Sequence, residues 1–174
     1  MAKEVTVIPG FTIKYKGTYE FEGFYRMIRE WFNKRSYDLT EKVYKSKNSG
    51  PETYEAELLL QAEKNITEYI KYEIILYLKF IDVQEREIKT PSNIKKITNG
   101  RVELRLRGAK TIFDYQNKFK GKVFFGLLDY SNIQDFVIDT LLKTYYEFKY
   151  YGPLEGEVLD LQNKMKEHLN MEST

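Results

Sequence analysis

The sequence predicts an α+β protein, an antiparallel sheet of about five strands with helices packed on one face. Residues 66–83 alternate between apolar and mixed positions, which is typical of a strand that buries one face. Strands of a parallel sheet are buried on both faces and would be apolar throughout, so the alternation indicates an antiparallel sheet. Apolar residues recur every three or four positions in 20–35, 132–151 and 154–169, as they do in amphipathic helices.

The predicted elements follow the order β-α-β-β-β-β-α-α. They are a strand at 5–17, a helix at 20–35, a hairpin at 37–64, a central strand at 66–83, a last strand at 101–115, and helices at 132–151 and 154–169. The central strand would reach roughly 60 Å at about 3.3 Å per residue, so we expect a bend or bulge within it.

Three irregularities are predicted inside these elements. Pro9 interrupts the first strand and favours an edge position or a bulge, because proline cannot donate to the ladder. The alternation slips by one residue at Gly108-Ala109, which indicates a bulge in the last strand. Gly152-Pro153 is expected to break the C-terminal helical stretch in two.

Turn residues predict where the strands are joined. The segment 47–51 is rich in asparagine, serine, glycine and proline and is expected to be a hairpin turn. A further turn is expected at Lys64-Asn65, directly before the central strand. Residues 85–98 are polar and are expected to form a loop that Asn99-Gly100, a strong hairpin signal, closes.

The chain of 174 residues is long enough to bury a core and is predicted to form one domain over 1–174. It has no cysteine, which excludes disulfides and thiolate metal sites and favours a cytoplasmic location. The N-terminal residues lack the apolar core of a signal peptide, and no apolar run approaches the roughly 20 residues of a membrane span. We therefore expect no membrane partner.

Motifs of the common enzyme classes are missing, so the sequence favours a non-enzymatic protein without a cofactor. It contains neither a glycine-rich phosphate loop nor a G-x-S-x-G motif. The sole histidine, His168, lies in an acidic helix and is expected to be solvated. Asp135 and Asp139 lie one helical turn apart and could share a cation, but such pairs are more often solvated, and no metal site is predicted. Nothing selects a catalytic carboxylate pair among the 26 acids.

Charge is unevenly distributed along the chain. Residues 95–122 carry nine bases and two acids, whereas 123–174 carry four bases and nine acids. The basic segment supplies candidate contacts to an anion or single-stranded nucleic acid: Arg101, Arg105, Arg107, Lys118, Lys120, Lys122, Phe113 and Tyr115. Arginines beside aromatic residues on a sheet face suit phosphate contacts and base stacking. The alternative, which we favour, is an ordinary charged face neutralised by acids such as Glu68 and Glu73.

The element order resembles a shortened helix-grip fold, in which a curved sheet grips a long C-terminal helix around an apolar cavity. The resemblance implies one possible function, the carriage of a small molecule between sheet and helix. Aromatic residues expected at the inner face would line the cavity: Phe11, Tyr15, Tyr72, Phe80 and Tyr145.

The leading functional prediction is an interaction or assembly protein that self-associates or docks on a larger complex. The helix at 132–151 has two adjacent apolar stripes, a wider surface than packing on one sheet requires. Aromatic residues crowd its end and form the candidate interface: Tyr145, Tyr146, Phe148, Tyr150 and Tyr151. Such residues are enriched at the buried centres of interfaces. The charge asymmetry would favour head-to-tail contacts between the basic sheet and the acidic helices.

Overall fold

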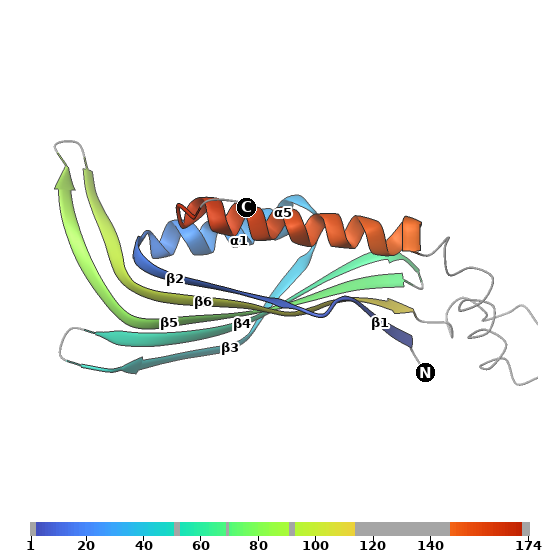
Figure 1. Ribbon diagram of the computed structural model, residues 1–174, viewed down its shortest axis with the longest axis horizontal. Coiled ribbons are helices and arrows are strands. Elements are labelled where there is room, and N and C mark those ends of the chain that lie inside the picture. The colour runs from blue at the N-terminus through green and yellow to red at the C-terminus, as the bar shows by residue number, and fades with distance from the viewer. Residues whose placement is uncertain (1–2, 51–52, 69, 91–92, 114–146, 172–174) are drawn as a thin grey trace, which may run out of the picture.

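The computed structural model describes residues 3–50, 53–68, 70–90, 93–113 and 147–171. These residues form a six-stranded antiparallel sheet with α-helices on one face, which confirms the predicted α+β class (Figure 1). The strands are β1 (Lys3–Ile8), β2 (Phe11–Tyr19), β3 (Asp38–Asn48), β4 (Tyr54–Thr67), β5 (Ile70–Thr90) and β6 (Asn93–Phe113). The helices are α1 (Phe21–Lys34), the π-helical turn η2 (Glu147–Tyr151) and α5 (Gly152–His168).

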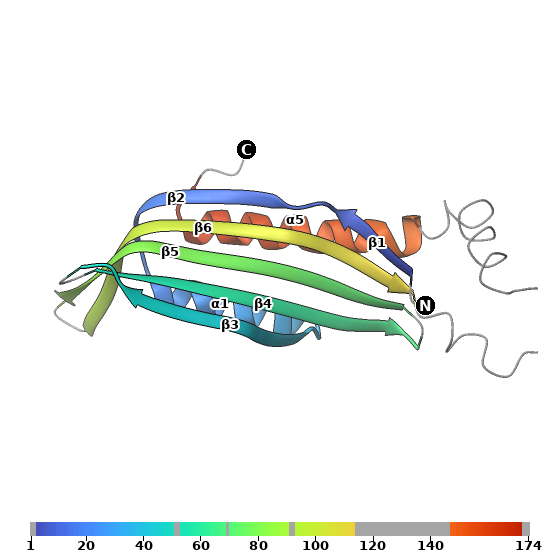
Figure 2. The same cartoon turned by 90° about the horizontal axis from the view of Figure 1, so that it is seen from below.

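β5 lies in the middle of the sheet. The strand order is β1-β6-β5-β4-β3, and β2 continues the β1 edge by also pairing with β6. Figure 2, seen from below, shows the strands in front and both α-helices behind them, so α1 and α5 cover the same face. α1 connects the two edges of the sheet, because β2 precedes it and β3 follows it.

The edge made by β1 and β2 is interrupted at Pro9-Gly10, and both strands pair with β6 there, as Pro9 predicted. Gly10 has a φ of +133°, and a Cβ atom at this position would lie 2.4 Å from the Leu106 carbonyl oxygen. A residue with a side chain would therefore collide with β6. Gly10 therefore allows the chain to pass from β1 to β2 while both strands stay paired with β6.

The bulge predicted at Gly108-Ala109 is present in β6. Leu106 pairs with Leu76 and Gly108 pairs with Ile75, so Arg107 has no partner in β5. The buried positions of β6 change parity at this point, and Ala109 is fully buried. A second register shift lies between Ile81 and Gln84 of β5, and the long hairpin bends there (Figure 1). The central strand thus contains the irregularity that its length predicted.

The turn predicted at Lys64-Asn65 is wrong. β4 continues to Thr67, which pairs with Ile70 at the start of β5. The inward residues of β4 and β5 both have even numbers, so the alternation passes through the turn without a change of phase. Because the alternation does not change phase at the turn, the sequence placed the start of the central strand at residue 66, within β4, instead of at Ile70.

The loop predicted at 85–98 is also wrong, because these residues belong to the β5–β6 hairpin. Pairing resumes at Gln84 and Asn99 and continues to Thr90 and Asn93. Asn99-Gly100 lies within β6. A Cβ atom on Gly100 would lie 3.1 Å from the Ile81 carbonyl oxygen, so this glycine permits the close approach of the two strands at the bend.

Both α-helices bury an apolar stripe against the inner face of the sheet. α1 buries the predicted residues Phe24, Ile28, Trp31 and Phe32. α5 buries Leu154, Val158, Leu161 and Met165. The inner face beneath them is formed by alternate residues of the central strands: Ala56, Leu58, Leu60, Ala62, Ile70, Tyr72, Ile74, Leu76, Leu78 and Phe80. Each large side chain among them contributes about 1.5–3 kcal/mol of burial free energy.

The helix predicted at 132–151 lies outside the described residues except for η2, which covers 147–151. The break predicted at Gly152-Pro153 is a change of helix type, because η2 runs directly into α5. Pro153 lies in the first turn of α5, the part of a helix where proline is tolerated. The last predicted helix, 154–169, corresponds to α5.

Candidate functional site

The sheet has a second face, which points away from α1 and α5, and we call it the open face (Figure 2). Within the described ranges, neither α-helix packs on it. Its side chains are the alternate residues left over from the core. They are the odd-numbered residues from Glu55 to Glu63 on β4, the odd-numbered residues from Lys71 to Ile81 on β5, and Arg101, Glu103, Arg105, Arg107 and Lys110 on β6.

Tyr77 lies at the centre of the open face. Its cross-strand neighbour on β4 is Leu59, and Leu59 in turn pairs with Val43, which is 37% exposed. Ile75 is the adjacent outward residue of β5. The Arg107 guanidinium lies 5.2 Å from the centroid of the Tyr77 ring. We call the apolar residues gathered here the Tyr77 patch: Val43, Leu59, Ile75 and Tyr77.

Charges of alternating sign border the Tyr77 patch. One row of cross-strand neighbours alternates from edge to edge: Lys45, Glu57, Lys79, Glu103 and Lys14. The Lys79 Nζ lies 3.0 Å from Glu57, and the Lys14 Nζ lies 3.7 Å from Glu103. Opposite charges on neighbouring strands attract each other, and solvent weakens the attraction at exposed positions. The row therefore stabilises the sheet and leaves little net charge.

The same contacts shift the pKa values of this row. A hydrogen bond from Lys79 lowers the pKa of Glu57, and a hydrogen bond from Arg105 lowers the pKa of Glu103. The bond to Glu57 raises the pKa of Lys79. Burial, followed by a hydrogen bond to Glu57, raises the pKa of Tyr77. At neutral pH Glu57, Lys79 and Glu103 are therefore ionised and Tyr77 is neutral.

The predicted basic site is only partly within the described residues. Arg101, Arg105 and Arg107 are exposed on the open face, as the alternation predicted. Arg101 is paired with Asp82, and Arg105 lies 2.8 Å from Glu103, so neighbouring acids neutralise two of these cations. Of the acids named from the sequence, Glu73 is the cross-strand neighbour of Lys110 in the same basic segment. Phe113 is the last residue of β6, and the other candidates lie outside the described residues: Tyr115, Lys118, Lys120 and Lys122.

The predicted aromatic interface is divided. Tyr145 and Tyr146 lie outside the described residues. Phe148 is 82% exposed, whereas Tyr150 is buried in the core and its carbonyl oxygen accepts a hydrogen bond of 2.6 Å from the Tyr72 hydroxyl. Tyr151 is partly buried and packs against the same core. Of the described members, Phe148 presents its ring to solvent.

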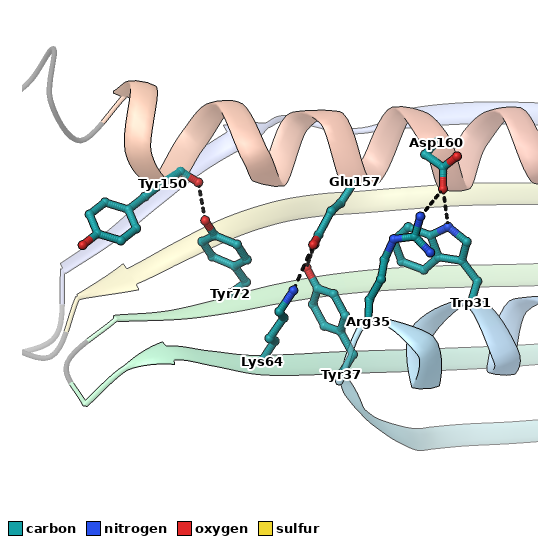
Figure 3. A network of polar contacts seen from close by, with 8 residues as sticks. All are labelled: Trp31, Arg35, Tyr37, Lys64, Tyr72, Tyr150, Glu157 and Asp160. Atoms are coloured by element: carbon teal, nitrogen blue, oxygen red, sulfur yellow. Dashed lines mark hydrogen bonds and ion pairs between the residues drawn. The ribbon is translucent and has the colours of Figure 1, made fainter.

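A polar network that sequence reasoning missed joins α5 to α1 and the sheet (Figure 3). The Asp160 carboxylate accepts hydrogen bonds from the Trp31 indole N–H at 2.7 Å and from Arg35 at 2.6 Å. The Arg35 guanidinium also lies 4.2 Å from the centroid of the Trp31 ring. One turn earlier, Glu157 accepts hydrogen bonds from Tyr37 at 2.5 Å and from Lys64 at 2.9 Å.

This network places both acids of the middle of α5 towards the protein. Burial, followed by the hydrogen bond to Glu157, raises the pKa of Tyr37, and burial raises the pKa of Tyr72 to about 12. The hydroxyls of these tyrosines therefore remain donors across the physiological range. Glu157 and Asp160 are three residues apart, which places them on one side of a helix, and this spacing was the signal available in the sequence.

Histidine and acid clusters in the described residues do not form a metal centre, because no group of three or more potential ligands is found there. The centroids of the His168 and Phe24 rings lie 5.5 Å apart. His168 is partly buried and not fully solvated as predicted. Asp135 and Asp139 lie outside the described residues. Neither of the described α-helices is both long and apolar enough to span a membrane.

No protein-family model, no curated protein and no solved structure matches the chain.

Proposed function

We propose that the protein is a non-enzymatic interaction or assembly protein that self-associates, or docks on a larger complex, through its open face. The observation that carries this proposal is the Tyr77 patch, an apolar centre on a sheet face whose other positions are mostly charged. Interfaces commonly have an apolar centre and a polar border, with tyrosine and arginine contributing most to affinity. Tyr77 with Arg107 over its ring fits the centre, and the alternating charges fit the border.

The open face is large enough for a stable interface. The stretch Ile70–Ile81 of β5 pairs on both sides, and at about 3.3 Å per residue it spans roughly 40 Å. The strands across the sheet lie about 4.8 Å apart, which gives a width of roughly 20 Å. The resulting area of roughly 800 Å² equals what one partner typically buries in a standard protein–protein interface.

The two-layer arrangement supports this role. We infer that the curved sheet holding α1 and α5 is a shortened form of a helix-grip fold. With the helices on the concave side, the hydrogen-bonded sheet is a platform whose opposite face is covered by neither α-helix of the described residues. A rigid surface loses little conformational entropy on binding, which favours affinity.

The proposal is tested by the oligomeric state of the purified protein. We expect sedimentation velocity to show a concentration-dependent dimer or larger species, and Tyr77→Ser to shift it towards monomer. Tyr44→Ser is the matched control, because Tyr44 is 61% exposed on edge strand β3 but alternates onto the other side of the sheet. A protein that is monomeric at every concentration and salt level, and recovers no partner in a pull-down, would refute the proposal.

A second candidate function, small-molecule carriage, is favoured by one observation on the inner face. The Tyr19 hydroxyl is buried without a hydrogen-bond partner among the described residues. Its ring stacks on Phe80 and meets Tyr15 edge to face, and the Phe21 ring also packs on Phe80. A single unsatisfied hydroxyl among aromatic rings can orient a mostly apolar ligand. Native mass spectrometry of protein from its own cells would then show a bound mass that Tyr19→Phe weakens.

A further inference from the structure

Arg107 is the outward cation of β5 and β6 that no carboxylate of the described residues neutralises. The other outward cations of these two strands each lie within 3.0 Å of an acid: Lys71 of Glu63, Lys79 of Glu57, Arg101 of Asp82, Arg105 of Glu103 and Lys110 of Glu4. Arg107 is exposed, and its guanidinium lies 5.2 Å from the centroid of the Tyr77 ring. Its charge and its N–H donors are therefore free to bind a group from outside the chain.

The backbone explains why Arg107 has no acid opposite it. The bulge in β6 leaves Arg107 without a cross-strand neighbour on β5. On the other side the pairing of β2 begins at Leu106 and that of β1 ends at Ala109, so the interrupted edge also leaves Arg107 unpaired. The positions from which a cross-strand acid could neutralise this cation are thus missing on both sides. Bulges re-aim side chains next to functional sites, and here the bulged residue lies over the Tyr77 ring.

We propose that Arg107 recognises a carboxylate, supplied by an aspartate or glutamate that lies among apolar residues on the surface of a partner protein. This inference rests on the proposed function and specifies the chemistry of the partner. A guanidinium offers pairs of N–H donors in one plane that match a carboxylate, and stacking on an aromatic ring holds that plane in place. The Tyr77 patch packs around the contact and excludes water, which strengthens a charge-assisted hydrogen bond.

The paired charges around Arg107 narrow the choice of partner. A single-stranded nucleic acid needs several free cations along its backbone, whereas the neighbouring Arg101 and Arg105 are already held by acids. Two copies packed open face to open face also lack the required group. The acids that border the Tyr77 patch, Glu57 and Glu103, are held by cations of their own chain. In self-association the carboxylate therefore comes from another surface of the second copy.

A library of random linear peptides displayed on phage tests this inference with the full-length protein. We expect peptides that are enriched on the wild type and lost on Tyr77→Ser to carry one aspartate or glutamate flanked by apolar residues. The tightest peptide is then synthesised with its acid and with the corresponding amide, and dissociation constants are measured by fluorescence anisotropy. The amide peptide, or Arg107→Gln, should each raise the dissociation constant about tenfold or more, and both together should raise it no further. The amide peptide tests the same contact on the unchanged protein.

Arg101→Gln is the matched control, because Arg101 is exposed on the same strand and face but is paired with Asp82. It should change the dissociation constant by less than about twofold. Thermal unfolding of both variants checks that the fold is retained. Peptides that require Tyr77 but carry no acid, or equal effects of Arg101→Gln and Arg107→Gln, would refute this inference and leave the proposed function standing. A selection without any Tyr77-dependent peptide would contradict both. An oligonucleotide that binds the wild type but not Arg107→Gln would assign Arg107 to phosphate and overturn the carboxylate.

Discussion

Replacing Asp160 by alanine tests whether the contact between α5 and α1 depends on the buried indole N–H. Trp31 is 2% exposed, and its N–H donates to Asp160 at 2.7 Å. Asp160→Ala leaves this donor buried without an acceptor, a change that costs roughly 1–3 kcal/mol. The Arg35–Asp160 pair is partly exposed, with side chains 29% and 41% accessible, so its loss adds only about 0–1 kcal/mol. We expect a total of about 2–3 kcal/mol.

A double-mutant cycle separates the two contributions. In the Trp31→Phe background there is no indole donor to orphan, so Asp160→Ala should cost only about 0–1 kcal/mol there. Asp160→Asn is the matched control, because it keeps an oxygen acceptor for Trp31 and removes only the charge that pairs with Arg35. Free energies of unfolding are measured by urea titration with the slope checked for constancy. Equal losses for Asp160→Ala in both backgrounds would refute the assignment of the main effect to the indole N–H.

Three further predictions concern the backbone, the charged row and nucleic acid. Gly10→Ala should destabilise the protein by about 1–3 kcal/mol, because a Cβ would lie 2.4 Å from the Leu106 carbonyl oxygen at a φ of +133°. Gly156→Ala, with nothing within 4 Å, should stabilise α5 by about 0.5–1 kcal/mol; equal signs for the two would contradict the geometry. The lowered pKa values of Glu57 and Glu103 contribute stability that is present above pH 4.5 and lost as the pH falls through the folded-state values. The melting temperature should therefore drop below pH 4.5, and Glu57→Gln should lower it at pH 7 and flatten that drop. A fluorescent single-stranded oligonucleotide should not bind at low salt, because Arg101 and Arg105 are paired with Asp82 and Glu103; binding that weakens steeply with salt would show that this neutralisation is incomplete.

The parts of the fold that follow from one-dimensional periodicity could be predicted from the sequence. α1 is such a case, because the residues at helical spacing are the ones buried: Phe24, Ile28, Trp31 and Phe32. The Gly108 bulge is another, since an inserted residue must change the parity of the buried positions and this change is visible in the chain. Where the pattern kept its phase across a junction, as between Thr67 and Ile70, no signal marked the turn.

The β5–β6 hairpin was missed for a different reason. Its outer part pairs through the backbone from Gln84 to Thr90 and from Asn93 to Asn99, and backbone pairing does not require apolar alternation. Asn99-Gly100 looked like a hairpin turn because the dipeptide has the right conformational freedom. In the folded chain Gly100 serves the close approach to Ile81 instead. The sequence signal for a turn thus marked a glycine that is needed for a close contact between two strands.

The candidate site could not be predicted from the sequence, because its residues become neighbours only through strand pairing. The three outward apolar residues of β4 and β5 share their side of the strand with charged residues in the sequence: Leu59, Ile75 and Tyr77. The sequence alone therefore did not indicate a surface patch. The three residues become neighbours only through the β4–β5 register, which places Leu59 opposite Tyr77. Arg101 and Asp82 likewise become neighbours only through the β5–β6 register, although they are 19 residues apart in the chain. A surface patch on a sheet depends on the strand order, and residues 95–122 were conspicuous in the sequence because their basic residues follow one another closely along the chain. Two of the acids that pair with those cations lie on other strands, since Asp82 of β5 pairs with Arg101 and Glu4 of β1 pairs with Lys110. An interpretation by segments therefore sees a basic stretch where the folded protein has paired charges on neighbouring strands.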